Sequence, residues 1–118
     1  MTGLSVLRHV YGLMNQPGRL TAEDGNESGL LAVNQIYSDL WRREHTDEFQ
    51  PLTHLRQELD LSWRCLPALT YGTAALLCLN GEDPHPYDRY LELYLRALPR
   101  VEGTPYRRSD VLLDGGER

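Results

Sequence analysis

Four histidines and two cysteines are the side chains in this chain best suited to bind a metal or act as nucleophiles. The histidines are His9, His45, His54 and His85. None follows another by four residues, and no cysteine lies near one at the spacing of a zinc site. Cys65 and Cys78 fall in an apolar stretch where a thiol is usually inert, and no Gly-x-Ser-x-Gly motif is present. These residue types therefore predict no metal site and no activated nucleophile.

Glycines and carboxylates that could hold phosphate or transfer protons also lack the necessary context. Gly25 with Gly29, and Gly115 with Gly116, have neither the lysine nor the preceding strand of a phosphate-binding loop. The acidic clusters adjoin caps or turns, which explains them without an active site. These clusters are Glu23-Asp24, Asp47-Glu48, Glu58-Asp60 and Glu82-Asp83. We therefore expect no cofactor.

An enzyme would need polar groups that converge in a pocket between helices. The candidates for such a pocket are Asn34, His45, His54 and Thr73. Their spacing predicts no convergence. An enzyme is thus the weakest functional hypothesis, and we expect none.

Composition and charge favour one soluble domain that does not grip nucleic acid. The 118 residues suit a single core. The net charge of −5 opposes binding to nucleic-acid phosphates. All twelve basic residues are arginine. No stretch approaches the roughly 18 apolar residues of a membrane span. Cys65 and Cys78 lie thirteen residues apart in one expected helix and point in directions too different for a disulfide. A reducing cytoplasm is the expected setting.

Hydrophobic spacing predicts an all-α fold of about four helices. The segment from His45 to Leu61, interrupted by Pro51, follows neither helical nor strand periodicity and predicts an irregular loop. Pro17-Gly18 is expected to end the first helix, Asp83-Pro84 to introduce the last and Pro99 to end it. The expected helices are Leu4–Met14, Gly29–Glu44, a third that follows the Ser62 cap and contains the apolar run Leu66–Leu79, and a fourth from Pro84 to Leu98.

The third of these segments is apolar nearly all round, which predicts a central helix. Its small residues Gly72, Thr73, Ala74 and Ala75 would let a neighbouring helix approach closely. Tyrosines and leucines form a seam along the last segment, which we interpret as core and not as a base-stacking platform. The seam consists of Tyr87, Tyr90, Leu91, Tyr94, Leu95 and Leu98. The remaining predicted core residues are Leu30, Val33, Tyr37, Leu40, Trp41, Leu69, Leu76 and Leu77.

Residues 1–100 are therefore expected to form one helical domain, and residues 101–118 an extended C-terminal tail. The tail has no periodicity long enough to fold alone, yet Arg107 and Arg108 precede an apolar cluster, Val111 to Leu113. Such residues supply the charge and apolar anchors for docking onto a neighbour. The alternative is a disordered terminus without function.

Four segments resemble the small helical head-to-tail connector proteins (adaptor or head-completion proteins) of tailed bacteriophages and prophages. The resemblance covers residues 4–100 and rests on the order and spacing of helices, a Leu-Pro-x-Leu-x-Tyr-Gly-x-Ala core and a final helix with the pattern Asp…Tyr…Tyr. The segments are Asn34 to Trp41, Pro51 to Thr53, Leu66 to Ala75, and Gly81 to Tyr94.

This resemblance implies a structural virion protein that forms a ring of about twelve identical subunits beneath the portal protein. Such a ring extends the DNA channel, through which double-stranded DNA passes without specific binding, and presents a surface to the next neck or tail protein. It is assembled in the host cytoplasm and resides in the virion neck. In that family the C-terminal segment reaches the portal. Here that segment would be Tyr106, Arg107, Arg108, Val111, Leu112 and Leu113.

Electrostatics agree with a channel role. Twelve copies at −5 carry about −60, and like charges keep DNA from adhering to a channel wall. The irregular segment supplies candidates for the channel or the downstream contact, because loops carry such roles on helical scaffolds. These candidates are Asp47, Glu48, His54, Arg56 and Glu58. The alternative hypothesis is a small acidic helical regulator that binds one partner and forms no ring.

Overall fold

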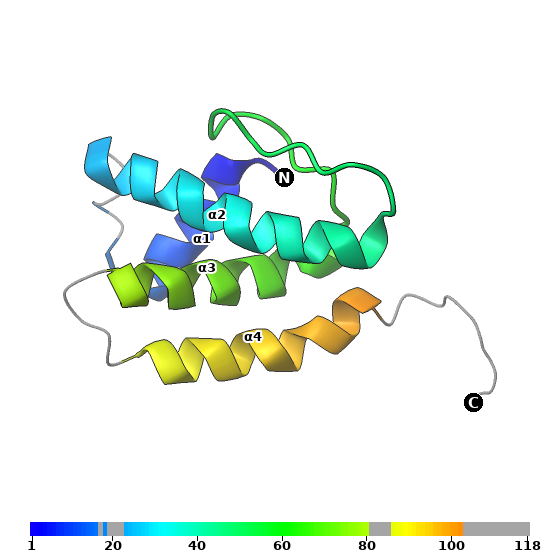
Figure 1. Cartoon of the computed structure of the whole chain (residues 1–118). Helices are drawn as coiled ribbons and strands as arrows, with labels where there is room; N and C mark the ends of the chain where they lie inside the picture. Colours follow the sequence, from blue (N-terminus) through cyan, green and yellow to red (C-terminus); the bar gives the residue numbers. More distant parts are fainter. Residues whose placement is uncertain (17, 19–22, 81–85, 103–118) are drawn as a thin grey trace.

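The computed structural model describes residues 1–16, 18, 23–80 and 86–102, and in these ranges the chain is all-α, without strands (Figure 1). A single 3-10 turn precedes the central helix. The elements in order are α1 (Gly3–Leu13), α2 (Glu23–Glu44), η2 (Trp63–Cys65), α3 (Leu66–Asn80) and α4 (Tyr87–Glu102). The predicted number of helices, the irregular segment after α2 and the central position of α3 are confirmed.

Local hydrogen bonds fix the bounds of α1. Thr2 and Ser5 form a capping box, in which the Ser5 amide donates to Thr2 Oγ1 and the Thr2 amide to Ser5 Oγ. At the other end Asn15 takes a left-handed φ of 59°, which stops the helix. The helix therefore ends at Leu13 with Asn15 as its stop, before the Pro17-Gly18 turn that was expected to end it.

The start of α2 differs from the prediction. The helix begins at Glu23, so Gly29 lies inside it and is not its first residue. A Cβ atom at Gly29 would lie 2.5 Å from Cδ1 of Leu7 in α1. The glycine thus serves as a contact point between two helices, and its apparent role as a boundary was wrong.

The predicted end of α4 is also wrong, because the helix continues through Pro99 to Glu102. Proline removes one helical hydrogen bond, here the one to the carbonyl of Leu95. Pro99 and Leu95 both lie on the exposed side of the helix, where water can hydrate that carbonyl. Val101 is only 2% exposed, so the packing of the last turn offsets the lost bond.

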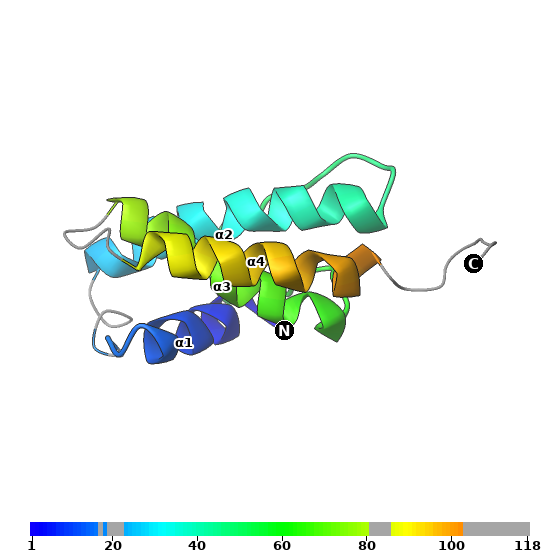
Figure 2. The same cartoon turned by 90° about the horizontal axis from the view of Figure 1, so that it is seen from below.

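Helix α3 packs between the other helices and depends on close approach. Figure 1 shows it between α2 and α4, and Figure 2 shows it running obliquely from the side of α1 at its start to that of α2 at its end. A Cβ atom at Gly72 would lie 2.9 Å from Cδ1 of Ile36 in α2 and 2.9 Å from Cδ1 of Tyr94 in α4. The small residue therefore permits α2 and α4 to meet α3 at one point, as its sequence predicts.

Most of the predicted core is buried. Leu30, Leu76, Leu91 and Leu98 are half-buried against it. Leu95 is 54% exposed, so its predicted place in the core was wrong. The buried stripe of α4 runs through Tyr90, Tyr94, Ala97 and Val101, and Leu95 lies about 100° round the helix from Tyr94. The fully buried members of the core include Val33, Leu40, Leu69, Val6, Leu7 and Val10.

Replacing Gly72 with leucine tests this arrangement. We expect the free energy of unfolding to fall by about 3 kcal/mol, because the new side chain must push Ile36 and Tyr94 away from α3. Urea unfolding followed by circular dichroism measures the change. Gly12→Ala is the matched control. No atom lies within 4 Å of its new Cβ, and we expect it to stabilise the helix by about 0.5 kcal/mol. Equal stability of Gly72→Leu and the unmodified protein would contradict the packing.

Candidate functional site

The candidate site is the segment 45–62, which connects α2 to α3 and runs back along α2 (Figure 1). Asn34 in α2 clamps its middle. Its Nδ2 donates to the carbonyl of Leu52 at 2.9 Å, and its Oδ1 accepts from the amide of Leu52 at 2.8 Å. Leu52 itself is buried. The segment is therefore fixed to the helix although it has no regular secondary structure.

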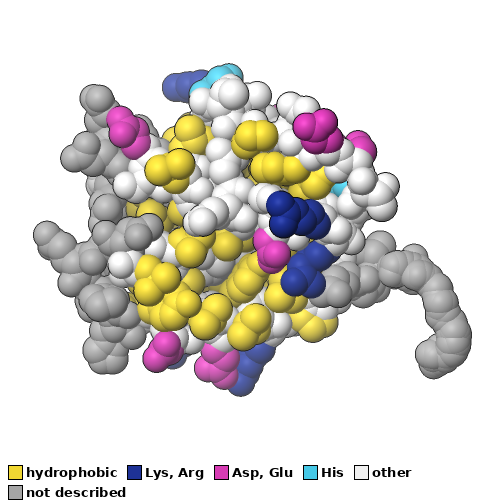
Figure 3. All heavy atoms as spheres, in the orientation of Figure 1, with side chains coloured by type: hydrophobic (Ala, Val, Ile, Leu, Met, Phe, Trp, Pro, Cys, Tyr) yellow, Lys and Arg dark blue, Asp and Glu magenta, His cyan; other side chains and the backbone are white. Residues whose placement is uncertain are grey.

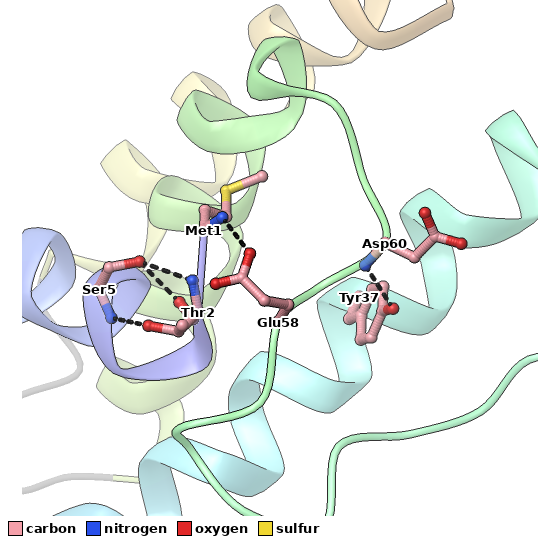
Figure 4. Close-up of polar contacts among 6 residues, drawn as sticks. All are labelled: Met1, Thr2, Ser5, Tyr37, Glu58 and Asp60. Carbon is pink, nitrogen blue, oxygen red and sulfur yellow. Dashed lines mark hydrogen bonds and ion pairs between the residues drawn. The ribbon is translucent and has the colours of Figure 1, made fainter.

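The N-terminus of α1 holds the next part of this loop (Figure 4). The amide of Leu4 donates to the carbonyl of Leu55 at 2.8 Å, and that of Leu59 to the carbonyl of Met1 at 2.9 Å. The ammonium group of Met1 lies 2.9 Å from Oε1 of Glu58. These contacts join residues more than fifty positions apart in the sequence.

Aromatic side chains support the two ends of the loop. Trp41 Nε1 donates to the carbonyl of Asp47 at 3.1 Å, and the Tyr37 hydroxyl accepts from the amide of Asp60 at 2.9 Å. The ring of His45 stacks on Trp41 with centroids 3.7 Å apart and an interplanar angle of 15°. Phe49 packs edge-on against Tyr37. Polar atoms of α2 thus bind the loop backbone, and the rings of His45 and Phe49 pack against the aromatic rings of α2.

An open hollow of about 510 Å³ lies between the loop, the first turn of α1 and the second turn of α2. Leucines form its apolar part, and Glu27, His54 and Arg56 bring charge or hydrogen-bonding capacity to it. The lining residues are Leu4, Glu27, Leu30, Thr53, His54, Leu55 and Arg56.

The structure divides the predicted channel or downstream-contact residues into three places. His54 and Arg56 line the hollow, and Glu58 pairs with the N-terminus. Asp47 and Glu48 are exposed beside Trp41. All five side chains are exposed, but they do not form one cluster. Leu4 and Leu30, which also line the hollow, were missed because periodicity places them on helices and cannot show that a loop folds over them. Glu27 was missed because the predicted helix began only at Gly29.

The predicted enzyme candidates have separate environments. Asn34 binds the loop backbone, His45 stacks on Trp41, and His54 is exposed. Thr73 is fully buried in α3, and its hydroxyl finds no hydrogen-bond partner within the described ranges. Across the same ranges, no three side chains of His, Cys, Asp or Glu are placed to hold a metal ion. None of the described helices is long and apolar enough to cross a membrane.

The predicted docking tail falls in the C-terminal residues 103–118. Its residues Tyr106, Arg107, Arg108, Val111, Leu112 and Leu113 lie outside the described residues. So do His85 and the Asp83-Pro84 helix start.

Two partly buried polar contacts link elements distant in the sequence and shift pKa values. Cys65 Sγ lies 3.4 Å from Oε2 of Glu44, which also accepts from the hydroxyl of Ser62. Burial, followed by the charge of Glu44, raises the pKa of Cys65 to about 12. Tyr94 donates to the carboxylate of Asp39, and burial together with this contact raises the pKa of the Tyr94 hydroxyl. Cys65 is therefore a neutral, structural thiol, as its apolar sequence context suggested.

Comparison of the chain with protein-family models, with curated proteins and with solved structures found no match.

The Asn34 clamp can be tested by replacing Asn34 with alanine. The amide and carbonyl of Leu52 would then lose their partner, at a cost of about 1–3 kcal/mol. We expect faster hydrogen exchange at the amides of residues 51–59, measured by mass spectrometry. The neighbouring exposed residue provides the control Gln35→Ala, which should leave exchange unchanged. Unaltered protection in Asn34→Ala would show that the clamp does not hold the loop.

The raised pKa of Cys65 predicts a loss of stability at alkaline pH. The folded state keeps the thiol neutral up to a pKa of about 12, whereas the unfolded chain releases this proton near pH 9. Stability from this group is thus complete below pH 9 and falls as the pH rises toward 12. We expect the urea midpoint to decrease from pH 8 to pH 10.5. Cys65→Ala should show a smaller decrease, and an equal one would assign the effect to other groups such as Tyr94.

Proposed function

We propose that this chain is a head-to-tail connector of a tailed bacteriophage or prophage, a structural subunit that forms a ring beneath the portal and extends the DNA channel. One observation carries the proposal: the segments that bear the resemblance to connectors pack against one another. Ile36, Gly72 and Tyr94 come from three of these segments and meet at one helix crossing. The fourth, Pro51 to Thr53, contains Leu52, which Asn34 binds.

The arrangement of the loop supports a channel or contact role. A ring that conducts DNA under pressure needs wall segments that do not move with the passing strand. Asn34, Tyr37 and Trp41 hold the backbone of this loop to α2, and its charged side chains remain exposed. Acidic side chains such as Asp47, Glu48 and Glu58 would repel DNA phosphates from the wall.

The tail completes the proposal. Its apolar cluster and basic pair would dock on the portal, gaining order from that contact. Helix α4 extends to Glu102, so the first two residues of the predicted tail belong to the packed helix, whose last turn is anchored by Val101. Assembly would take place in the host cytoplasm, and the protein would then reside in the virion neck.

Cryo-electron microscopy of the full chain mixed with the portal protein of the same phage or prophage tests this function. A closed ring of about twelve copies seated on the portal is the expected result. A chain that stays monomeric with the portal present would contradict the proposal and favour the alternative, a small acidic regulator with one binding partner.

The tail makes a separate prediction. Replacing Leu112 and Leu113 with serine removes two apolar anchors, so we expect binding to the portal to weaken at least tenfold while the helical circular dichroism and melting temperature stay unchanged. Surface plasmon resonance with immobilised portal measures the affinity. Thr104→Ala in the same tail is the control. Full affinity of the double variant would show that the tail does not anchor the subunit.

A further inference from the structure

Several large hydrophobic side chains of the described helices lie outside the core and are exposed to solvent. Leu79 is 52% exposed, Leu95 54% and Trp63 68%. Single exposed apolar residues are common, but clustered ones mark interaction surfaces. These residues belong to two different features, one on α3 and α4 and one on η2.

The first feature is an apolar surface on α3 and α4. Gly72 touches both α2 and α4, so its side of α3 faces the space between them, and Leu76 and Leu79 follow on that side after four and seven residues. On α4, Tyr94 bonds Asp39 of α2, so the adjacent leucines flank the same space. We name this surface the α3–α4 face; it consists of Leu76, Leu79, Leu91, Leu95 and Leu98. Figure 3 shows hydrophobic side chains gathered over these two helices.

Acidic residues border the α3–α4 face. Asp88 and Glu92 are exposed on α4, seven and three residues before Leu95 and thus on nearly the same side. Glu92 pairs with Arg96 at 2.6 Å, but this pair is mostly exposed and free to exchange partners. The face therefore combines an apolar centre with an acidic edge.

The second feature is Trp63, which projects from η2 beside the exposed Arg64. This turn precedes α3, whose start lies on the side of α1, whereas the end of α3, with Leu76 and Leu79, lies toward α2 (Figure 2). Tryptophan and arginine are both enriched among the residues that dominate binding energy at interfaces. The turn that carries Trp63 and the end of α3 that carries Leu79 therefore lie toward different helices, and the two features have complementary charge.

We propose that a second copy of this chain occupies the α3–α4 face, with its Trp63 on the leucines and its Arg64 at Asp88 and Glu92. Because the two surfaces differ, the contact is heterologous and repeats from copy to copy, which generates a ring when the rotation closes. This inference rests on the proposed connector function and names the contact between neighbouring ring subunits.

Sedimentation velocity of the full chain from micromolar to near-millimolar concentration tests the contact. We expect oligomers that increase with concentration. Trp63→Ala and Leu95→Glu should each weaken association at least tenfold, because each removes one of the two surfaces. Leu13→Glu is the matched control, since Leu13 is 43% exposed on α1, outside both features, and should associate normally. Circular dichroism verifies that each variant is folded.

Mixing the two variants distinguishes a heterologous from a symmetric contact. A Trp63→Ala copy keeps its α3–α4 face and a Leu95→Glu copy keeps its Trp63, so the mixture should form one-to-one dimers that cannot grow. Persistent monomers of the unmodified chain at all concentrations, or association unaffected by both variants, would overturn the inference.

The outcome can be separated from that of the proposed function. A portal-bound ring that forms equally well with both variants would leave the connector function standing and remove this contact. Self-association that follows the predictions, without any binding to the portal, would keep the contact and remove the connector function.

Discussion

At Gly72, helices α2, α3 and α4 meet where there is no room for a side chain. A Cβ atom there would lie 2.9 Å from both Ile36 and Tyr94, closer than carbon atoms pack in protein interiors. The remaining packing depends on this approach, because it brings the buried stripes of α2 and α4 onto the central helix. Gly29 has the corresponding role between α2 and Leu7 of α1. Gly29 and Gly72, which have no side chain beyond hydrogen, therefore determine how closely the four helices pack.

Helix α2 links the core to the candidate site. One side of it contributes Val33 and Leu40 to the core, and an adjacent side offers polar atoms of Asn34, Tyr37 and Trp41 to the loop backbone. Buried backbone groups of an irregular segment must find such partners, since no ladder of helix or strand bonds supplies them. The loop is ordered for this reason, and its exposed charges and the adjacent hollow are held at fixed positions on the bundle.

The described surface carries both exposed charged pairs and exposed apolar side chains. Charged pairs such as Asp39 with Arg43 and Glu92 with Arg96 lie on exposed helix sides and contribute little to stability. Trp63 and the leucines of the α3–α4 face, in contrast, retain apolar area that a neighbouring copy could bury. An assembly subunit needs both properties: a core that folds alone and an apolar surface small enough to remain soluble before assembly.

The sequence by itself determined the helices, the central position of α3 and most of the core, because hydrophobic periodicity and caps act over a few residues. It misjudged Pro99 and Leu95, where packing of Val101 and the rotation of α4 overrode local signals. Only the tertiary structure decided that Asn34 binds Leu52, that Glu44 meets Cys65 and that Tyr94 meets Asp39, 55 residues away. Such pairs depend on how helices cross, and no spacing along the chain encodes which side chains a crossing brings together.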